Sequence, residues 1–171
     1  MSKTPTACPI SNDHTDEPLT NGDYRDINCP TCGQFKISGT LIATLPNNPE
    51  IDTNARAVLS HYIRQKNEAG AQPFFSGNMI DKVIEEFSLP GPAEQADNLI
   101  LYLGRNTTVG KMVQFSIPAL TASIGALDSA NSMFVCQHLF KQHYIMHDHQ
   151  DLIFTTNNLA SLGLHMKVET A

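Results

Sequence analysis

The sequence lacks any apolar run long enough to cross a lipid bilayer. No stretch approaches the roughly 18–20 consecutive apolar residues that a membrane-spanning helix needs. Residues 1–7 are polar and include a proline, so they also lack the apolar core of a secretory signal peptide. We therefore expect a cytoplasmic protein with no membrane partner.

Basic residues are scarce as well. The chain has 11 Lys and Arg against 17 Asp and Glu, which gives a formal net charge of −6. Neither half is basic when the chain is divided at residue 60. A large nucleic-acid surface needs clustered positive charge, so the composition disfavours one.

Motifs of common enzyme classes are also absent. The chain contains no glycine-rich dinucleotide or phosphate-binding motif and no Gly-x-Ser-x-Gly nucleophile motif. Carboxylates such as Glu85, Glu86, Asp148 and Asp151 are typical of solvated helix and loop positions. At 171 residues, of which 41% are hydrophobic, the chain can still form a core. We therefore expect a folded protein that is not an enzyme.

What the sequence does contain is a Cys-Pro-Thr-Cys-Gly motif at residues 29–33. Two thiolates at this spacing on a tight turn can bind one zinc ion, and the glycine supplies the positive φ that the turn needs. Cys8 lies upstream, where a zinc ribbon has its other turn, and Ser11 stands where that turn would carry its second thiolate. The pattern predicts a structural zinc bound by Cys8, Cys29 and Cys32.

The fourth zinc ligand is open to several interpretations. His14 follows the first turn closely and imidazole is an ordinary zinc donor, so we predict it as the fourth ligand. Asp13, Asp16 and a water molecule are the alternatives. The cysteine pair itself could instead be a redox motif, a structural disulfide or a turn that no longer binds metal. A hairpin predicted at 24–28 and 34–38 disfavours the redox motif, and nothing indicates an oxidising compartment.

The order of predicted elements indicates the α+β class. We assign residues 1–45 to a zinc-ribbon-like module of β hairpins, which ends at the two prolines of 46–49. Residues 52–171 are predicted as a helical segment followed by a winged helix-turn-helix-like domain, because Gly125 lies where that motif turns. Apolar periodicity places helices at 52–70, 79–87, 93–104, 117–124, 129–143 and 157–166, and strands at 112–115, 144–147 and 152–155.

The predicted helix 129–143 offers polar side chains to a partner. Those that could contact nucleic acid or protein are Asn131, Ser132, Gln137, Lys141 and Gln142. Only Lys141 is cationic, so a protein partner or a homo-oligomer formed through residues 144–171 is favoured over nucleic acid. A second metal site at His143 and His147 is disfavoured because we expect the helix to end between them.

Four segments together resemble a known bacterial region. They are GDYRDINCPTCGQFKISGT at 22–40, NLILYL at 98–103, IGA at 124–126 and HLF at 138–140. The region combines a zinc ribbon with helices and a winged-helix-like fold. It resembles the N-terminal part of uncharacterised multidomain proteins, some of which carry TIR-type or other effector domains associated with phage defence. The resemblance implies a sensing or interaction module, from whose pattern Ser11 departs.

Three functions are compatible with these features. The acidic balance and the lack of enzyme motifs favour a non-enzymatic binding or regulatory module with a structural zinc. The order of helices favours a winged-helix DNA-binding transcriptional regulator as the alternative. A small zinc-dependent enzyme is the third, in which Ser11 would leave a coordination position open for water.

Overall fold

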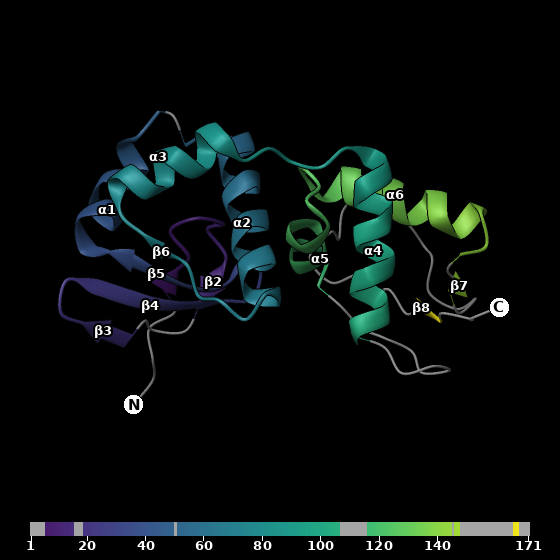
Figure 1. Ribbon diagram of the computed structural model, residues 1–171, viewed down its shortest axis with the longest axis horizontal. Helices are drawn as coiled ribbons and strands as arrows, with labels where there is room; N and C mark the ends of the chain where they lie inside the picture. Colours follow the sequence, from purple (N-terminus) through teal and green to yellow (C-terminus); the bar gives the residue numbers. More distant parts are fainter. Residues whose placement is uncertain are drawn as a thin grey trace. The chain divides into compact units, whose positions relative to one another are not determined.

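The computed structural model describes residues 6–15, 19–49, 51–106, 116–144, 146–147 and 166–167. The chain divides into two units, Met1–Leu89 and Pro90–Ala171 (Figure 1). Each unit has its own cluster of buried apolar side chains. The mixed α+β class predicted from the sequence is confirmed.

The described residues of the first unit form two sheets. Their strands are β1 (Thr6–Ala7), β2 (His14–Thr15), β3 (Leu19–Asn21), β4 (Tyr24–Cys29), β5 (Gly33–Ser38) and β6 (Phe74–Phe75). β1 and β2 form a short antiparallel pair. The larger sheet has the order β3-β4-β5-β6, in which β6 is parallel to β5 and the other pairs are antiparallel.

Side chains alternate across β4 and β5, so that one face of the hairpin enters the core. Ile27 and Cys29 of β4 are buried, as are Phe35 and Ile37 of β5. Cys29 pairs with Gly33 at the end of the ladder. The predicted hairpin is therefore present, and it places the Cys-Pro-Thr-Cys motif at its turn.

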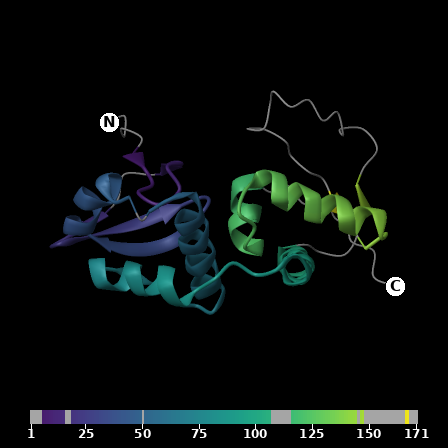
Figure 2. The ribbon, with the colours of Figure 1, turned by 90° about the horizontal axis from the view of Figure 1, so that it is seen from above.

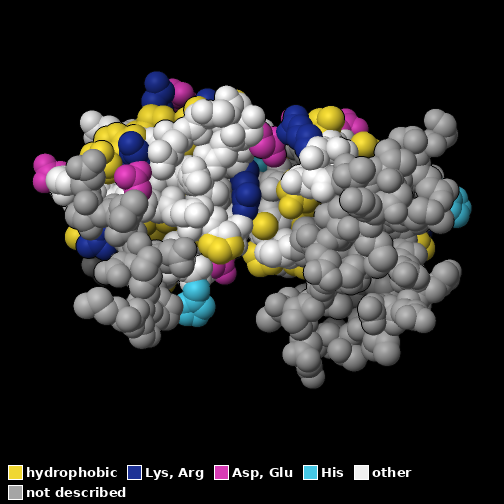
Figure 3. Space-filling view, turned by 90° about the horizontal axis from the view of Figure 1, so that it is seen from below, with side chains coloured by type: hydrophobic (Ala, Val, Ile, Leu, Met, Phe, Trp, Pro, Cys, Tyr) yellow, Lys and Arg dark blue, Asp and Glu magenta, His cyan; other side chains and the backbone are white. Residues whose placement is uncertain are grey.

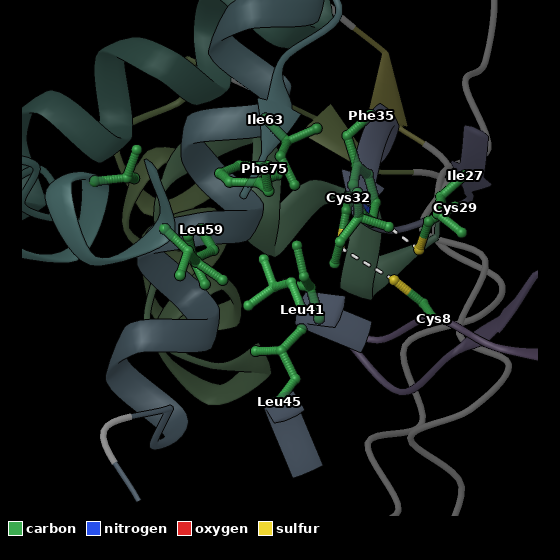
Figure 4. Packing of buried hydrophobic residues seen from close by; sticks show 14 of the residues in the cluster. Cys8, Ile27, Cys29, Cys32, Phe35, Leu41, Leu45, Leu59, Ile63 and Phe75 are labelled. Carbon is green, nitrogen blue, oxygen red and sulfur yellow. Dashed lines mark hydrogen bonds between the residues drawn. The ribbon is translucent and has the colours of Figure 1, made fainter. Parts of the chain in front are cut away.

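Helices cover this hairpin. They are α1 (Gly39–Thr44), the 3-10 turn η1 (Leu45–Asn47), α2 (Thr53–Glu68) and α3 (Gly77–Glu86). α2 begins where the sequence predicts, because the Asp52 carboxylate accepts a hydrogen bond from the Ala55 N–H at 2.8 Å. α2 packs on β5 and α3 (Figure 2). Its side chains Leu59 and Ile63 are fully buried beside Phe75 (Figure 4).

The boundary between the units differs from the predicted one. The sequence predicted a first module that ends at residue 45 and a second that begins at residue 52, whereas the units divide between Leu89 and Pro90. The prolines of 46–49 do interrupt regular structure. They do not separate domains, because the apolar face of α2 is buried in the same cluster as the sheet.

In the described part of the second unit, three helices pack together: α4 (Pro92–Asn106), α5 (Ile117–Ile124) and α6 (Ser129–Lys141). Figures 1 and 2 agree that α6 runs across α4. The core of the second unit contains Leu99 of α4, Leu120 of α5 and Leu139 of α6. All three helices lie where apolar periodicity predicted them.

A tight turn joins α5 to α6. Gly125 ends α5 with a φ of 76°, a left-handed conformation that glycine adopts without strain. The Asp128 carboxylate then caps α6 by accepting a hydrogen bond from the Asn131 N–H at 2.8 Å. A turn between two helices is therefore present at Gly125, where the sequence predicted one.

The wing of the proposed winged helix stays a prediction. β7 (Met146–His147) pairs antiparallel with β8 (Met166–Lys167). Met166 is thus in a strand, which corrects the predicted end of a helix over 157–166. The predicted strands at 112–115 and 152–155 and the remainder of that helix lie outside the described residues.

No helix in the described part of the chain is both long enough and apolar enough to cross a membrane.

Candidate metal centre

Three cysteines of the first unit converge, as predicted. Cys8 follows β1, Cys29 ends β4, and Cys32 lies in the turn before β5. Their Sγ atoms all lie within 4.8 Å of one another, and those of Cys8 and Cys32 are 3.9 Å apart (Figure 4). All three thiols are free, and none of these residues is more than 2% exposed.

This donor set fits a soft metal ion. Zinc takes thiolates at about 2.3 Å, which in a tetrahedron sets neighbouring sulfurs about 3.8 Å apart. The sulfurs of Cys8 and Cys32 are 3.9 Å apart, which is about 0.1 Å from this tetrahedral separation. Cys8, Cys29 and Cys32 could therefore hold a zinc ion with small movements of their side chains.

The cysteines lie on two turns with the same residue pattern. Residues 8–11 read Cys-Pro-Ile-Ser and residues 29–32 read Cys-Pro-Thr-Cys. In the first turn, the Asn12 N–H donates to the Cys8 carbonyl at 2.9 Å. In the second, the Cys32 N–H points at the Cys29 sulfur at 3.4 Å. The two turns thus present their side chains to a common centre.

Gly33 fixes the exit of the second turn. Its φ is +97°, and a Cβ built there would lie 2.2 Å from Oδ1 of Asn67. Asn67 uses that oxygen to accept a hydrogen bond from the Gln34 N–H at 2.6 Å, and its Nδ2 donates to the Gln34 carbonyl at 2.8 Å. A side chain at this position would displace the Asn67 amide from its hydrogen bonds with Gln34, so both this contact and the positive φ favour the glycine expected from the sequence.

Helix α2 holds both turns through two arginines. Arg56 Nη1 donates to the carbonyl oxygens of Pro9 at 3.3 Å and Ile10 at 2.6 Å. Arg64 Nε donates to the Thr31 carbonyl at 2.7 Å, and its Nη2 donates to the carbonyl of Pro30. A zinc ion with three thiolates would carry one net negative charge, which these half-buried guanidinium groups would partly offset.

A serine of the same helix face contacts the cluster. Ser60 Oγ lies 3.3 Å from Cys32 Sγ and is buried. Arg56, Ser60 and Arg64 follow one another at i, i+4 and i+8, so they share one face of α2. None of these three residues was predicted as part of the site, although their spacing along the helix is a signal present in the sequence.

The three thiols differ in their affinity for protons. Hydrogen bonds from the Cys32 and Cys8 thiols lower the pKa of Cys29 to about 2. The hydrogen bond to Cys29 is also the main cause that raises the pKa of Cys8 and Cys32, and burial raises both further. Of the three thiols, Cys29 therefore most favours the thiolate form, and metal binding releases the protons that the cluster still holds.

The structure does not bring His14 to the cluster. Along β2, Thr15 is buried and donates to the Asn28 carbonyl at 2.9 Å, so the preceding His14 points the opposite way and is exposed. Among the described residues, only the three cysteines form a group that could hold a metal. Asp13 is not in that group, and Asp16 lies outside the described residues.

The predicted partner face of α6 is only partly available. Asn131, Gln137, Lys141 and Gln142 are exposed. The prediction that Ser132 contacts a partner is wrong, because this residue is completely buried. Its Oγ lies 2.8 Å from Thr121 Oγ1 and donates to the Ser129 carbonyl. It joins α5 to α6 and cannot contact a partner.

Charges of both signs are mixed on the face that Figure 3 shows. Its Lys and Arg side chains form separate spots interspersed with Asp and Glu. A continuous basic surface, which duplex binding would need, is not visible among the described residues of this face.

The fold and the cysteine cluster together define an α+β protein with a candidate metal centre in its first unit. No family model, no curated protein and no solved structure matches this chain. The resemblance to the zinc-ribbon region of defence-associated proteins therefore stays a prediction.

Proposed function

We propose that the first unit binds one zinc ion through Cys8, Cys29 and Cys32, and that the chain acts as a non-enzymatic binding or sensing module. The observation that carries this proposal is the convergence of three buried thiols from two turns that one helix holds. A shared metal ion would stabilise three thiols that lie this close together in the interior.

The proposed zinc is structural because it would link segments that are distant in sequence. Cys8 and Cys32 are 24 positions apart, and joining them closes the loop that contains β2, β3 and β4. Structural zinc contributes about 10–16 kcal/mol in small metal-binding modules, which compares with a total stability of about 5–15 kcal/mol for a typical domain. The fold of the first unit would then depend on the metal.

The composition of the cluster supports a structural role over catalysis. A zinc hydrolase needs a general acid or base beside the metal, usually Glu or His. In the described part of the chain, no histidine or carboxylate joins the three cysteines in the group of side chains that could hold the metal. This supports a module that works by binding, whose partner we propose to be a protein because the chain is acidic.

The test is the metal content of the full chain purified without chelator. We expect about one zinc per chain, and we expect the double variant Cys29→Ser/Cys32→Ser to lose it together with the thermal stability of the first unit. Cys136→Ser is the matched control, because this buried cysteine belongs to the second unit and should leave zinc binding intact. A native protein with far less than one zinc per chain would refute the proposal.

DNA binding is the second candidate function. It is favoured by the tight turn at Gly125 and by the capped helix α6 with exposed Asn131, Gln137 and Lys141. The acidic net charge opposes it, so we rank it below protein binding.

A further inference from the structure

The two cysteine turns correspond residue by residue. Cys8 matches Cys29, Pro9 matches Pro30, Ile10 matches Thr31, and Ser11 matches Cys32. Helix α2 treats them alike, because Arg56 donates to the carbonyls of the second and third residues of the first turn and Arg64 does the same in the second turn. The likeness therefore holds in sequence and in contacts.

This correspondence places Ser11 at the fourth corner of the metal centre. The equivalent residue of the other turn, Cys32, is one of the three clustered thiols. Ser11 Oγ lies 3.3 Å from Cys29 Sγ, and the Asp13 N–H donates to the same oxygen at 3.3 Å. The hydroxyl therefore lies next to the Cys29 sulfur, as the correspondence of the two turns predicts for a fourth ligand.

The fourth corner is also the accessible one. Cys8, Cys29 and Cys32 are nearly completely buried, whereas Ser11 is half-buried. Ser60 carries the other hydroxyl beside the cluster, and it is buried. It contacts the Cys32 sulfur, so we assign it the role of a hydrogen-bonding neighbour of that sulfur, away from solvent. A small ligand from solvent would reach the centre past Ser11.

We propose that Ser11 marks the fourth coordination position of the zinc centre, and that this position exchanges with a small exogenous thiol. The inference rests on the proposed function, because it presupposes that the three cysteines hold the metal. A serine hydroxyl is a weak neutral donor to zinc and a thiolate is a strong one, so exchange is favourable. The incoming thiol gives its proton to the buffer, and the oxygen donor leaves unchanged; no oxidant or reductant takes part.

The experiment uses the full chain loaded with Co²⁺, whose near-ultraviolet charge-transfer absorption grows with the number of thiolate ligands. We expect the native protein to show three thiolates, and Ser11→Cys to raise the absorption by roughly one third, as expected for a fourth. Added 2-mercaptoethanol should raise the absorption of the native protein toward that level and leave Ser11→Cys unchanged. Ser11→Ala should keep three thiolates and the response to 2-mercaptoethanol.

His14→Ala is the matched control, because His14 is exposed and should leave the visible spectrum unchanged. An altered spectrum in that variant, an unchanged absorption in Ser11→Cys, or a native protein that does not respond to 2-mercaptoethanol would overturn the inference. A chain that binds neither Co²⁺ nor zinc would instead refute the proposed function, so the two failures are distinguishable.

Discussion

Arg56 and Arg64 lie about two helical turns apart on one face of α2 and donate hydrogen bonds to matching carbonyl oxygens of two different cysteine turns. The helix therefore sets the separation of the two turns through these hydrogen bonds. Since the turns carry the sulfurs, the geometry of the centre depends on a helix that supplies none of its thiol ligands. This coupling explains why α2 belongs to the first unit rather than to a separate domain.

Removing either arginine should weaken the metal centre. Arg56→Ala and Arg64→Ala each remove charge-assisted hydrogen bonds to carbonyls, and we expect each to cost about 1–2 kcal/mol of the free energy of unfolding of the first unit. Zinc affinity, measured by competition with a chelator, should fall as well. Arg25→Ala is the control, because that side chain is exposed on β4. Equal zinc affinities in all three variants would show that α2 does not position the turns.

Gly33→Ala should be far more damaging than other glycine substitutions in this unit. The new Cβ would meet Oδ1 of Asn67 at 2.2 Å, in addition to the cost of a positive φ. We expect a loss of more than about 2 kcal/mol in the free energy of unfolding, measured by urea denaturation.

Gly70→Ala is the matched control: its φ is +78° but no atom lies within 4 Å of the new Cβ, so only the backbone cost of about 1 kcal/mol applies. Similar losses in both variants would contradict the role given to Asn67.

The parts that the sequence predicted correctly depend on local patterns. The Cys-Pro-Thr-Cys-Gly motif favours a turn through its own proline and glycine, and the apolar periodicity that predicts α2, α5 and α6 is likewise local. The predicted boundary at residues 45–52 differs from the division of the units between Leu89 and Pro90, because only tertiary packing shows that α2 covers the sheet. Ser132 was assigned to the wrong face for a related reason, since its hydroxyl is satisfied by Thr121 of a different helix.

Cys136 should make the second unit sensitive to alkaline pH. Burial raises the pKa of its thiol from 9.0 to about 12. Below pH 9 the thiol is protonated in both folded and unfolded chains, so it adds no pH dependence. Between pH 9 and pH 12 the unfolded chain loses this proton and the folded chain keeps it, so the free energy of unfolding should fall by roughly 1.4 kcal/mol per pH unit.

The measurement compares the native protein with Cys136→Ala by chemical denaturation from pH 7 to pH 11. The variant loses some packing and is less stable at pH 7, but the difference between the two proteins should shrink as the pH rises above 9. Titration of the other three thiols cancels in this difference because both proteins contain them. A difference that stays constant over the whole range would show that the Cys136 thiol ionises normally in the folded state.

Duplex DNA should bind weakly, if at all, at physiological salt. The chain carries a net charge of −6, and Lys141 is the only Lys or Arg among the exposed residues of α6 named as possible contacts. Each phosphate contact that a protein makes lowers the logarithm of its affinity by about 0.9 for each unit rise in the logarithm of the salt concentration. An interface with one cation would therefore show a small salt dependence and a low affinity.

Gel-shift measurements with duplex DNA at several salt concentrations, on the native protein and on Lys141→Glu, test this. A submicromolar, salt-sensitive complex that Lys141→Glu abolishes would replace protein binding by DNA regulation as the favoured function.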